Sequence, residues 1–431
     1  MVETISANEF RDMVDAARRG EREFVVVDTR PEESYAGWRI AGSINYVYKP
    51  FHDFDRDGFE AETGIGPEET VVTVCAKGKS SHALADDLAA AGYEDVYAID
   101  DGMRGWSAVY DHAEIPLPDA GDDTLEIVQI QRRAKGCLGY LIVGGRAADG
   151  EDGEDGEDDD RVAVADSDGS RIAVAIDVSR HGEEWRTAAA ARDASIAAVL
   201  DTHVHADHLS GGRALADDLG VPYVLPAAAA DRDVAYDFDA LERNEVLDVG
   251  GVDVKALATP GHTDDGASYL VGRSAVLTGD ALFTDSVGRT ELQFAAGDEG
   301  RERESAGSRT GAERLHDSLH GTLLAEPDDV VVLPGHFSVA NDGTTGDAVP
   351  GEPVATTVGE ARTGIGILDR DREAFVEEIT ATLPEKPPNY ESVIAANRGV
   401  ESPADEVAAI ELEMGPNRCA AEPAPEPEAD D

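Results

Sequence analysis

A short segment of the chain carries four side chains of the kinds that commonly bind metal ions. Residues 202–208 read Thr-His-Val-His-Ala-Asp-His and follow an apolar run that predicts a β-strand. Because alternate side chains of an extended backbone point to the same face, His203 and His205 can reach one metal ion together. We expect Asp207 and His208 at the start of the helical run that follows, where they would supply ligands from another side.

Three further residues of matching type follow strand-like runs elsewhere in the chain. Each comes within a few residues of the end of an apolar run, and strand ends that deliver such residues imply one shared site. One histidine would be weak support, but five of the 11 histidines belong to this set. The predicted metal ligands are His203, His205, Asp207, His208, His262, Asp280 and His336.

These motifs resemble the metallo-β-lactamase superfamily. The matching segments are 202–208, 259–263 (Thr-Pro-Gly-His-Thr), 278–280 (Thr-Gly-Asp) and 333–336 (Leu-Pro-Gly-His). The resemblance covers most of residues 125–400 and implies an αββα sandwich with metal ions at the edge of two sheets. Its H-x-H-x-D-H form resembles the branch that contains glyoxalase II and the persulfide dioxygenases. It implies one metal position with His203, His205, His262 and Asp280, and another with Asp207, His208, His336 and Asp280.

An arginine shortly after Asp280 is the more selective clue. The stretch 288–293 (Gly-Arg-Thr-Glu-Leu-Gln) is similar to a segment of persulfide dioxygenases in which an arginine holds the carboxylate of a low-molecular-weight thiol. The resemblance implies this role for Arg289, whose planar guanidinium suits carboxylates. A surface ion pair is the alternative. A charged insertion after residue 293, and Phe337 where these enzymes often have aspartate, are departures from the pattern.

Cys75 lies in a loop that favours an anion. The loop, 75–80 (Cys-Ala-Lys-Gly-Lys-Ser), stands between a predicted strand and a predicted helix, so backbone N–H groups and the helix N-terminus surround the sulfur. Lysine is scarce in this chain, yet Lys77 and Lys79 flank this cysteine, and their charge would lower its pKa. We interpret Cys75 as a nucleophile and both lysines as substrate-binding residues, with a buried inert cysteine as the alternative.

The loop and its surroundings resemble the rhodanese sulfurtransferases. The match covers residues 1 to about 115 and includes 27–30 (Val-Asp-Thr-Arg), 40–42 (Ile-Ala-Gly) and 101–106 (Asp-Gly-Met-Arg-Gly-Trp). It implies that Cys75 carries a sulfane sulfur as a persulfide. We expect Asp28 and Arg30 to support the fold and not to take part in catalysis.

The elements that must position these residues form two domains. Residues 1–117 alternate apolar strand-like runs with helical runs, which predicts an α/β domain with a parallel sheet. A proline-rich junction at 115–118 predicts a linker. Residues 118–415 form the metal-binding domain, with a solvated acidic insertion near 145–168, and residues 416–431 are expected to be a disordered acidic tail.

Composition limits the partners. A net charge of −54, from 90 acidic and 36 basic residues, argues against nucleic acid and membrane partners and favours adaptation to a salt-rich cytosol. The three cysteines do not describe a disulfide framework, and the first residues resemble no signal peptide. We therefore expect a cytoplasmic protein. A homodimer, and roles for Cys137 and Cys419, are left open.

Together the two resemblances imply sulfane-sulfur metabolism. The preferred hypothesis is a persulfide dioxygenase in which iron(II) is held by His203, His262 and Asp280, coupled to sulfur transfer at Cys75. The rival hypothesis is a dinuclear zinc thioester hydrolase of the glyoxalase II type. The small-molecule partner is accordingly a thiol persulfide or a thioester. A third hypothesis, a sulfur carrier with a structural metal, is disfavoured by open-site ligands without cysteine.

Overall fold

The N-terminal domain contains a five-stranded parallel sheet, as the alternating apolar runs predict. The structure is a computed structural model that describes residues 2–51, 54–118, 125–146, 161–163, 170–293, 300–381 and 385–421. The strand order is β1-β5-β4-β2-β3, with every neighbouring pair parallel. The strands are β1 (Glu3–Ile5), β2 (Val25–Asp28), β3 (Ile44–Asn45), β4 (Val71–Val74) and β5 (Val96–Ile99). The helices are α1 (Ala7–Arg18), α2 (Glu32–Gly37), α3 (Arg56–Thr63), α4 (Lys79–Ala90) and α5 (Gly102–Trp106).

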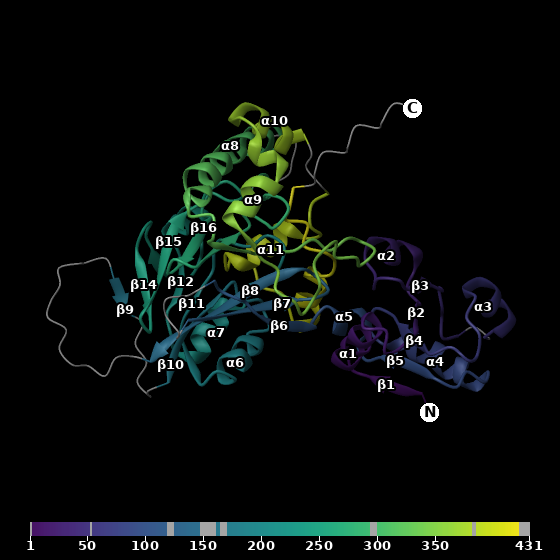
Figure 1. Ribbon diagram of the computed structural model, residues 1–431. Helices are drawn as coiled ribbons and strands as arrows, with labels where there is room; N and C mark the ends of the chain where they lie inside the picture. Colours follow the sequence, from purple (N-terminus) through teal and green to yellow (C-terminus); the bar gives the residue numbers. More distant parts are fainter. Residues whose placement is uncertain are drawn as a thin grey trace.

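The larger domain is built on two seven-stranded sheets (Figure 1). The first has the order β13-β12-β11-β10-β8-β7-β6, and the second has the order β19-β18-β17-β16-β15-β14-β9. The strands of the first are β6 (Tyr110–Glu114), β7 (Glu126–Arg132), β8 (Cys137–Arg146), β10 (Arg171–Ile176), β11 (Ala194–Leu200), β12 (Tyr223–Pro226) and β13 (Asp239–Leu241). Those of the second are β9 (Arg161–Ala163), β14 (Val246–Val249), β15 (Val252–Ala258), β16 (Ala267–Val271), β17 (Ala275–Gly279), β18 (Val331–Pro334) and β19 (Thr356–Thr357).

The apolar runs pack between the sheets and under helices on their outer faces. Ile142 and Val174 of the first sheet share one buried cluster with Tyr269 and Leu333 of the second. Burial of such side chains is the main driving force for this layered arrangement. The outer helices are α6 (Glu183–Ala190) and α7 (Gly212–Leu219) on the first sheet, and α8 (Gly300–Gly321), α9 (Val358–Gly364) and α10 (Arg372–Ala381) on the second. The expected αββα sandwich is confirmed.

The boundary between the domains differs from the predicted residue 117. Strand β6 pairs antiparallel with β7 and so belongs to the sandwich. Ile115 of the proposed linker is buried in the inter-sheet core because its neighbours continue the sheet edge. The domains are also joined by charge: Arg133 at the turn after β7 pairs with Asp15 of α1 at 2.7 Å. The proline-rich segment therefore runs along the sandwich instead of separating two free bodies.

The prediction of a disordered tail from residue 416 needs correcting for residues 416–421. After α11 (Tyr390–Asn397) and α12 (Glu406–Leu412), the chain runs along residues 287–289, where Ala421 N–H donates to the Val287 carbonyl at 2.9 Å. Cys419 is fully buried there. Acidic composition was a poor guide because this short stretch also supplies apolar and amide side chains that pack. Most of the predicted acidic insertion, and residues 422–431, lie outside the described residues.

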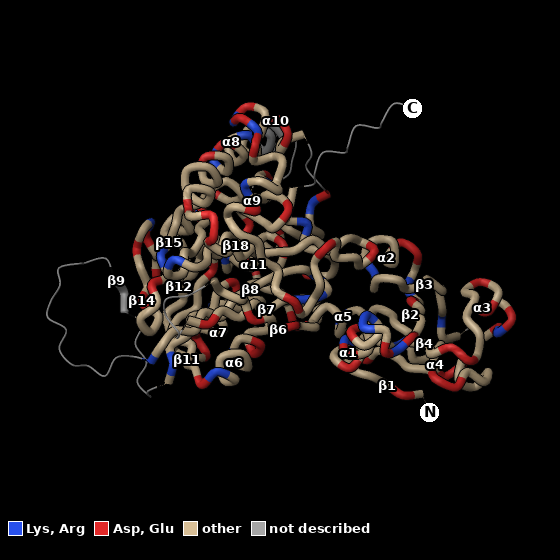
Figure 2. The backbone as a smooth tube through the Cα atoms, in the orientation of Figure 1, with Lys and Arg blue, Asp and Glu red and all other residues tan. Residues whose placement is uncertain are grey.

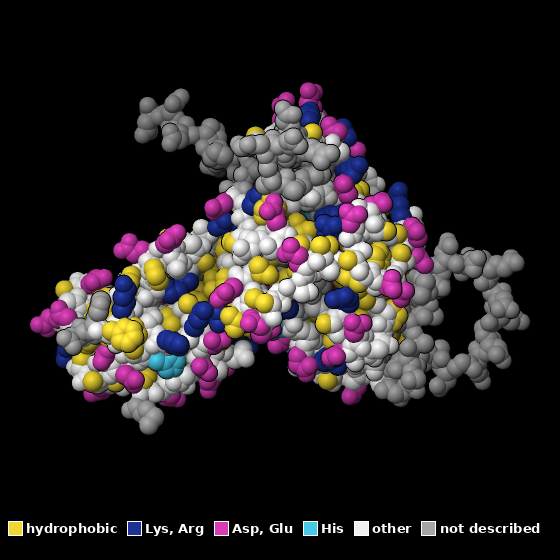
Figure 3. All heavy atoms as spheres, turned by 180° about the vertical axis from the view of Figure 1, so that it is seen from behind, with side chains coloured by type: hydrophobic (Ala, Val, Ile, Leu, Met, Phe, Trp, Pro, Cys, Tyr) yellow, Lys and Arg dark blue, Asp and Glu magenta, His cyan; other side chains and the backbone are white. Residues whose placement is uncertain are grey.

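Acidic side chains are distributed over both domains and not confined to one end. Figure 2 shows Asp and Glu along the tube from the N-terminal sheet to the outer helices, and Figure 3 shows them around the opposite face. Within the described residues, no helix is both long and apolar enough to cross a membrane. The salt adaptation expected from this charge stays a prediction.

Candidate metal centre and sulfur site

The seven predicted ligands come together at one edge of the sandwich. His203 follows β11, His262 follows β15, Asp280 directly follows β17 and His336 follows β18. All seven side chains are buried. Helix α7 begins only at Gly212, later than predicted. Asp207 and His208 therefore lie in the preceding loop.

Three of the ligands converge with free lone pairs. Nε2 of His262 lies 3.4 Å from Oδ2 of Asp280, and Nε2 of His203 lies 3.9 Å from the same oxygen. None of these three atoms has a hydrogen-bond partner among the described residues, although all are buried. Buried polar atoms without a partner are costly, so a cation is the natural occupant of the space between them. This donor set fits a metal ion held by two histidines and one carboxylate.

Neighbouring groups fix which nitrogen of each histidine faces that space. The Thr202 hydroxyl donates to Asp177 at 3.0 Å, so at 2.9 Å from Nδ1 of His203 it acts as an acceptor. Nδ1 of His203 thus carries the proton and Nε2 is left for a metal, as in most histidine metal sites. Burial also lowers the pKa of His203 well below its ordinary value, which favours the neutral ligand form.

His205 lies beside His203 but has acidic neighbours of its own. Its Nε2 lies 3.3 Å from Oδ1 of Asp177, and its ring groups with Asp177 and Asp201. The rings of His203 and His205 nevertheless lie side by side, with centroids 4.3 Å apart, so their binding of one metal ion stays a prediction.

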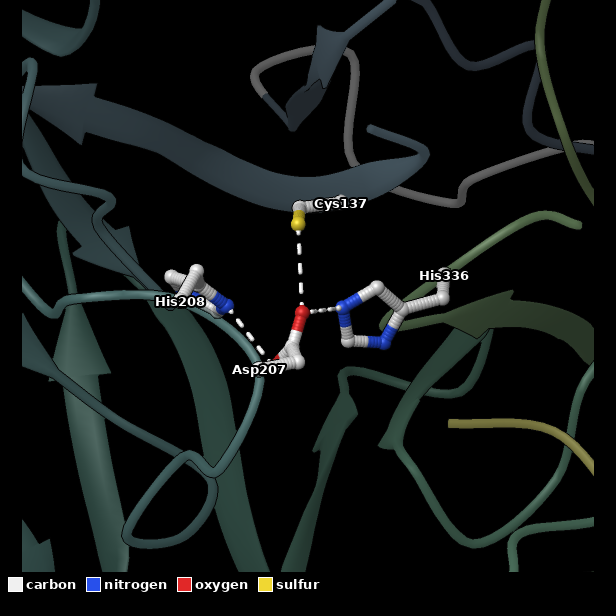
Figure 4. A group of neighbouring side chains, drawn as sticks. All are labelled: Cys137, Asp207, His208 and His336. Carbon is white, nitrogen blue, oxygen red and sulfur yellow. Dashed lines mark hydrogen bonds and ion pairs between the residues drawn. The ribbon is translucent and has the colours of Figure 1, made fainter. Parts of the chain in front are cut away.

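Asp207, His208 and His336 form a second group, and Figure 4 shows their side chains pointing toward one another and toward Cys137. Oδ2 of Asp207 lies 2.9 Å from Nε2 of His336, and Oδ1 lies 3.0 Å from Nδ1 of His208. Nδ1 of His336 lies 2.6 Å from Oδ1 of Asp280. Asp280 therefore contacts His336 through Oδ1, while its Oδ2 faces His203 and His262.

Two cysteines at this centre were not assigned a role from the sequence. Sγ of Cys137 lies 3.3 Å from Oδ2 of Asp207. Cys419 can offer its sulfur within 4.8 Å of ligand atoms of Asp207, Asp280 and His336. The only signal for Cys137 was its place directly before an apolar strand, while nothing around Cys419 marked it.

Arg289 is buried under the C-terminal segment. Its guanidinium donates to Glu291 at 2.7 Å, to the Glu385 carbonyl at 3.1 Å and to the Arg418 carbonyl at 3.0 Å. Its own carbonyl accepts a hydrogen bond from Nδ1 of His262 at 2.7 Å, which orients that ligand. It is not the surface ion pair considered as the alternative. A role in holding a substrate carboxylate stays a prediction and requires Arg289 to exchange present partners for substrate.

The loop of Cys75 lies between β4 and α4, as predicted. The following 101–106 motif packs against it: a Cβ at Gly102 would lie 2.0 Å from the Cys75 carbonyl oxygen, so only glycine permits this approach. Burial raises the pKa of the Cys75 thiol, but hydrogen bonds from Ser81, Ser80 and backbone N–H groups outweigh it and lower the pKa below its ordinary value. Such a thiol is suited to nucleophilic attack.

The two lysines near Cys75 lie on the exposed side of its loop. The Lys77 ammonium is 3.2 Å from Oε1 of Glu411 in α12, so it contacts the sandwich domain. Lys79 opens helix α4 and is exposed. Hydrogen bonds from Ser81, Ser80 and the Lys77 backbone lower the pKa of Cys75, while the effect of the lysine charges stays a prediction. Substrate binding by Lys77 and Lys79 stays a prediction.

Asp28 and Arg30 have the structural role expected of them. The Arg30 guanidinium donates to both oxygens of the buried Asp28 carboxylate, and it also donates to the Trp38 carbonyl at 2.6 Å. Neither residue adjoins Cys75 in the chain, and their mutual pairing satisfies both charges inside the domain.

Comparison with known proteins places both domains in families. Residues 6–109 match the model of the rhodanese-like domain, and residues 173–336 match that of the metallo-beta-lactamase superfamily. An uncharacterized Mycobacterium tuberculosis protein is 32% identical over 168 residues, covering 32% of this chain and 68% of its own. A metallo-beta-lactamase structure from Staphylococcus aureus has TM-score 0.50 and 20% identity, covering 66% of this chain and 76% of that one.

A curated relative carries a hydrolase name. A probable hydroxyacylglutathione hydrolase of Schizosaccharomyces pombe is 33% identical over 149 residues, or 34% of this chain. The chain spans about half the length of that relative, 50%. The matches and the ligand geometry lead to one assignment. The chain is a metalloenzyme of the metallo-beta-lactamase superfamily that carries an N-terminal rhodanese-like domain.

Proposed function

We propose that the sandwich domain is an iron-dependent persulfide dioxygenase and that the rhodanese-like domain transfers sulfur through Cys75. The observation that carries the proposal is the convergence of His203, His262 and Asp280 on buried atoms, Nε2 of each histidine and Oδ2 of Asp280, that have no hydrogen-bond partner among the described residues. Two histidines and one carboxylate on one face are typical of iron(II) oxygenases and leave positions open for dioxygen and substrate. Iron held there would supply the activation of dioxygen.

In the overall reaction a thiol persulfide, RSSH, reacts with dioxygen and water to give the thiol RSH, sulfite and two protons. The outer sulfur is oxidised and dioxygen is reduced. The chain's own residues prepare the site: Thr202 holds His203 in one tautomer, the Arg289 carbonyl holds His262, and His336 keeps one Asp280 oxygen engaged. All three ligand side chains are buried.

At Cys75 the thiolate attacks the outer sulfur of thiosulfate. A sulfur–sulfur bond forms on Cys75, the bond to the sulfite group breaks, and sulfite leaves with the electron pair. The lowered pKa of Cys75 raises the thiolate fraction near neutral pH. A small thiol can then take the sulfur from Cys75 and become the persulfide substrate of the metal site.

The alternative proposal is a dinuclear zinc thioester hydrolase. The hydroxyacylglutathione hydrolase name of the relative favours it, and so does the second group of Asp207, His208 and His336. It requires Asp280 to bridge two metals, so Oδ1 must leave Nδ1 of His336, which lies 2.6 Å away.

The two proposals differ in metal and in oxygen use. Protein loaded with iron(II) under reducing, high-salt conditions is expected to consume oxygen when given glutathione persulfide or another small persulfide, and to release sulfite. Zinc-loaded protein is the control and should consume none. Oxygen-independent cleavage of a lactoyl thioester, with no oxygen uptake on any persulfide, would establish the hydrolase instead.

A further inference from the structure

We propose that a cavity between the two domains binds a small organic carboxylate with an apolar body, and that Arg39 holds the carboxylate. The cavity has a volume of about 500 Å³, within the range of ordinary ligand pockets. One wall comes from α1, β2 and the segment 38–42, and the other comes from residues 133–134 and 339–350 of the sandwich. The inference goes beyond the proposed reaction and does not depend on it.

Aromatic side chains form the apolar wall of this interdomain cavity. The ring of Phe10 packs edge-on against Trp106 and Phe24, with centroids 5.2 and 5.8 Å apart. Trp38 and Ile40 line the same wall, and both are buried. Large side chains held in fixed packing offer apolar contact area and lose little freedom when a ligand binds. The wall therefore suits an alkyl or aromatic body.

The charge of the lining is the reverse of that of the chain. Three arginines line the cavity, Arg18, Arg39 and Arg133, and none of the described residues that line it is an aspartate or a glutamate. The chain as a whole carries 90 acidic residues against 36 lysines and arginines. A positive lining in so acidic a protein complements a ligand with an anionic end.

Arg39 is the arginine with charge available for a ligand. The Arg133 guanidinium already pairs with Asp15 and Asp111, each at 2.7 Å. Arg39 has no ion pair with a carboxylate among the described residues. Its guanidinium lies 4.8 Å from the centre of the Tyr35 ring and 3.5 Å from the Tyr35 carbonyl oxygen. A planar guanidinium in this position can bind a carboxylate through two parallel hydrogen bonds.

Arg39 also lines a neighbouring polar hollow of about 440 Å³. The carboxylates of that hollow have partners: the Thr344 hydroxyl donates to Asp342 at 2.6 Å, and the Arg418 guanidinium donates to Glu385 at 2.7 Å. Hydrogen bonds from Thr344 are the main cause of the lowered pKa of Asp342, and the Arg39 charge adds to them. Arg39 therefore borders an apolar and a polar space, where a ligand with one charged end would place that end.

The backbone of Arg39 is fixed against the sandwich. Its N–H donates to the Asn341 carbonyl at 3.0 Å. Gly343 has φ of 81°, and a Cβ there would lie 2.4 Å from the Arg39 carbonyl oxygen, so only glycine permits this approach. A ligand in the cavity would contact both domains at this junction and should stabilise the folded protein.

The test titrates the full chain by calorimetry with octanoate and with naphthoate, which share the carboxylate and differ in the apolar body. At least one of them should bind saturably with one equivalent and raise the midpoint of thermal unfolding. Octanol is the uncharged control and should bind about 10-fold or more weakly than octanoate, because it cannot form the charged hydrogen bonds. Absence of saturable binding for both carboxylates would overturn the proposal.

A charge-removing variant tests the role of Arg39. Arg39→Gln should weaken carboxylate binding by about 10-fold or more and leave octanol binding unchanged. Arg22→Gln is the matched control, because the Arg22 guanidinium also lies over a tyrosine ring, 5.3 Å from the centre of Tyr97, and Arg22 does not line the cavity. Equal losses for octanoate and octanol in Arg39→Gln, or an equal loss of octanoate binding in Arg22→Gln, would contradict the assignment.

A measurement on wild-type protein locates the site without a variant. Benzoylbenzoate is an aromatic carboxylate that cross-links under ultraviolet light, and mass spectrometry should find it on segments 38–42 or 339–346. Labelling at the metal centre or at the Cys75 loop instead, or a dimer that octanoate dissociates, would overturn the proposal. Neither sulfur transfer nor oxygen uptake is measured, so failure of the proposed function is a separate result.

Discussion

Arg289 and Glu291 form a buried ion pair beside the metal centre, with Nε of Arg289 2.7 Å from Oε1 of Glu291 and both residues 1% exposed. If a substrate carboxylate binds Arg289, it must replace Glu291. The Glu291→Gln variant removes the charge that competes with the substrate for Arg289. Adding Arg289→Gln to that variant should raise KM for the thiol persulfide by a factor equivalent to about 1.5 to 3 kcal/mol. Iron content should not change. An unaltered KM would leave Arg289 as a residue that only orients His262 through its carbonyl.

The first metal position should fail when any of its three ligands is removed. His203→Ala, His262→Ala and Asp280→Ala are each expected to abolish iron binding and turnover, while sulfur transfer at Cys75 continues in the separate domain. Metal analysis and a thiosulfate sulfurtransferase assay would check this. Normal iron content in all three variants would contradict the site.

Thr202 should act through His203. Thr202→Val removes the hydrogen bond that fixes Nδ1 of His203, and iron affinity should fall by about 10-fold to 100-fold. Thr202→Ser keeps the hydroxyl and is the matched control. Equal iron affinities in the two variants would show that the hydroxyl has no such effect.

The Cys75 loop predicts a pH effect of definite sign. Cys75→Ser should lose thiosulfate sulfurtransferase activity, whereas Cys137→Ser and Cys419→Ser should keep it.

Because Ser81 helps to hold the Cys75 pKa below its ordinary value, Ser81→Ala should raise that pKa and move the midpoint of Cys75 alkylation to higher pH. A midpoint that stays in place, or persulfide sulfur found by mass spectrometry on Cys419 instead, would contradict the assignment.

Glu413 should be important for stability because it pairs with the buried Arg132 at 2.9 Å and with the partly buried Arg180. Glu413→Gln leaves Arg132 uncompensated and should lower the free energy of unfolding by about 3 to 5 kcal/mol. Glu406→Gln is the control, since Glu406 also pairs with Arg180 but is exposed. Despite burial, which raises it, pairing with Arg132 and Arg180 lowers the pKa of Glu413 to about 2.

The lowered pKa of Glu413 also predicts how the free energy of unfolding depends on pH in acid. The contribution of Glu413 should be complete above the ordinary glutamate pKa and be lost as the pH falls toward about 2. Chemical unfolding at several pH values would measure it. Parallel acid dependence in wild type and Glu413→Gln would argue against this pairing as the cause.

The clustering of the seven candidate ligands was predictable from sequence because strand ends deliver most of them, and strand runs are read from local apolar patterns. Contacts between residues that are far apart in the chain were not predictable. Cys137 reaches Asp207 across 70 positions in the chain, and no local pattern encodes such a distance. The contact of His205 with Asp177, 3.3 Å from Nε2 to Oδ1, was likewise not predictable, because Asp177 follows another strand. Composition predicted that residues 416–421 are disordered, although they pair with the distant residues 287–289.

The C-terminal segment has a consequence for the order of assembly. Glu413 holds the loop of His208 through Leu209, and Cys419 lies over Asp207 and Asp280. A ribosome makes these residues after every predicted metal ligand. The centre can therefore be enclosed only after this C-terminal segment has left the ribosome and docked.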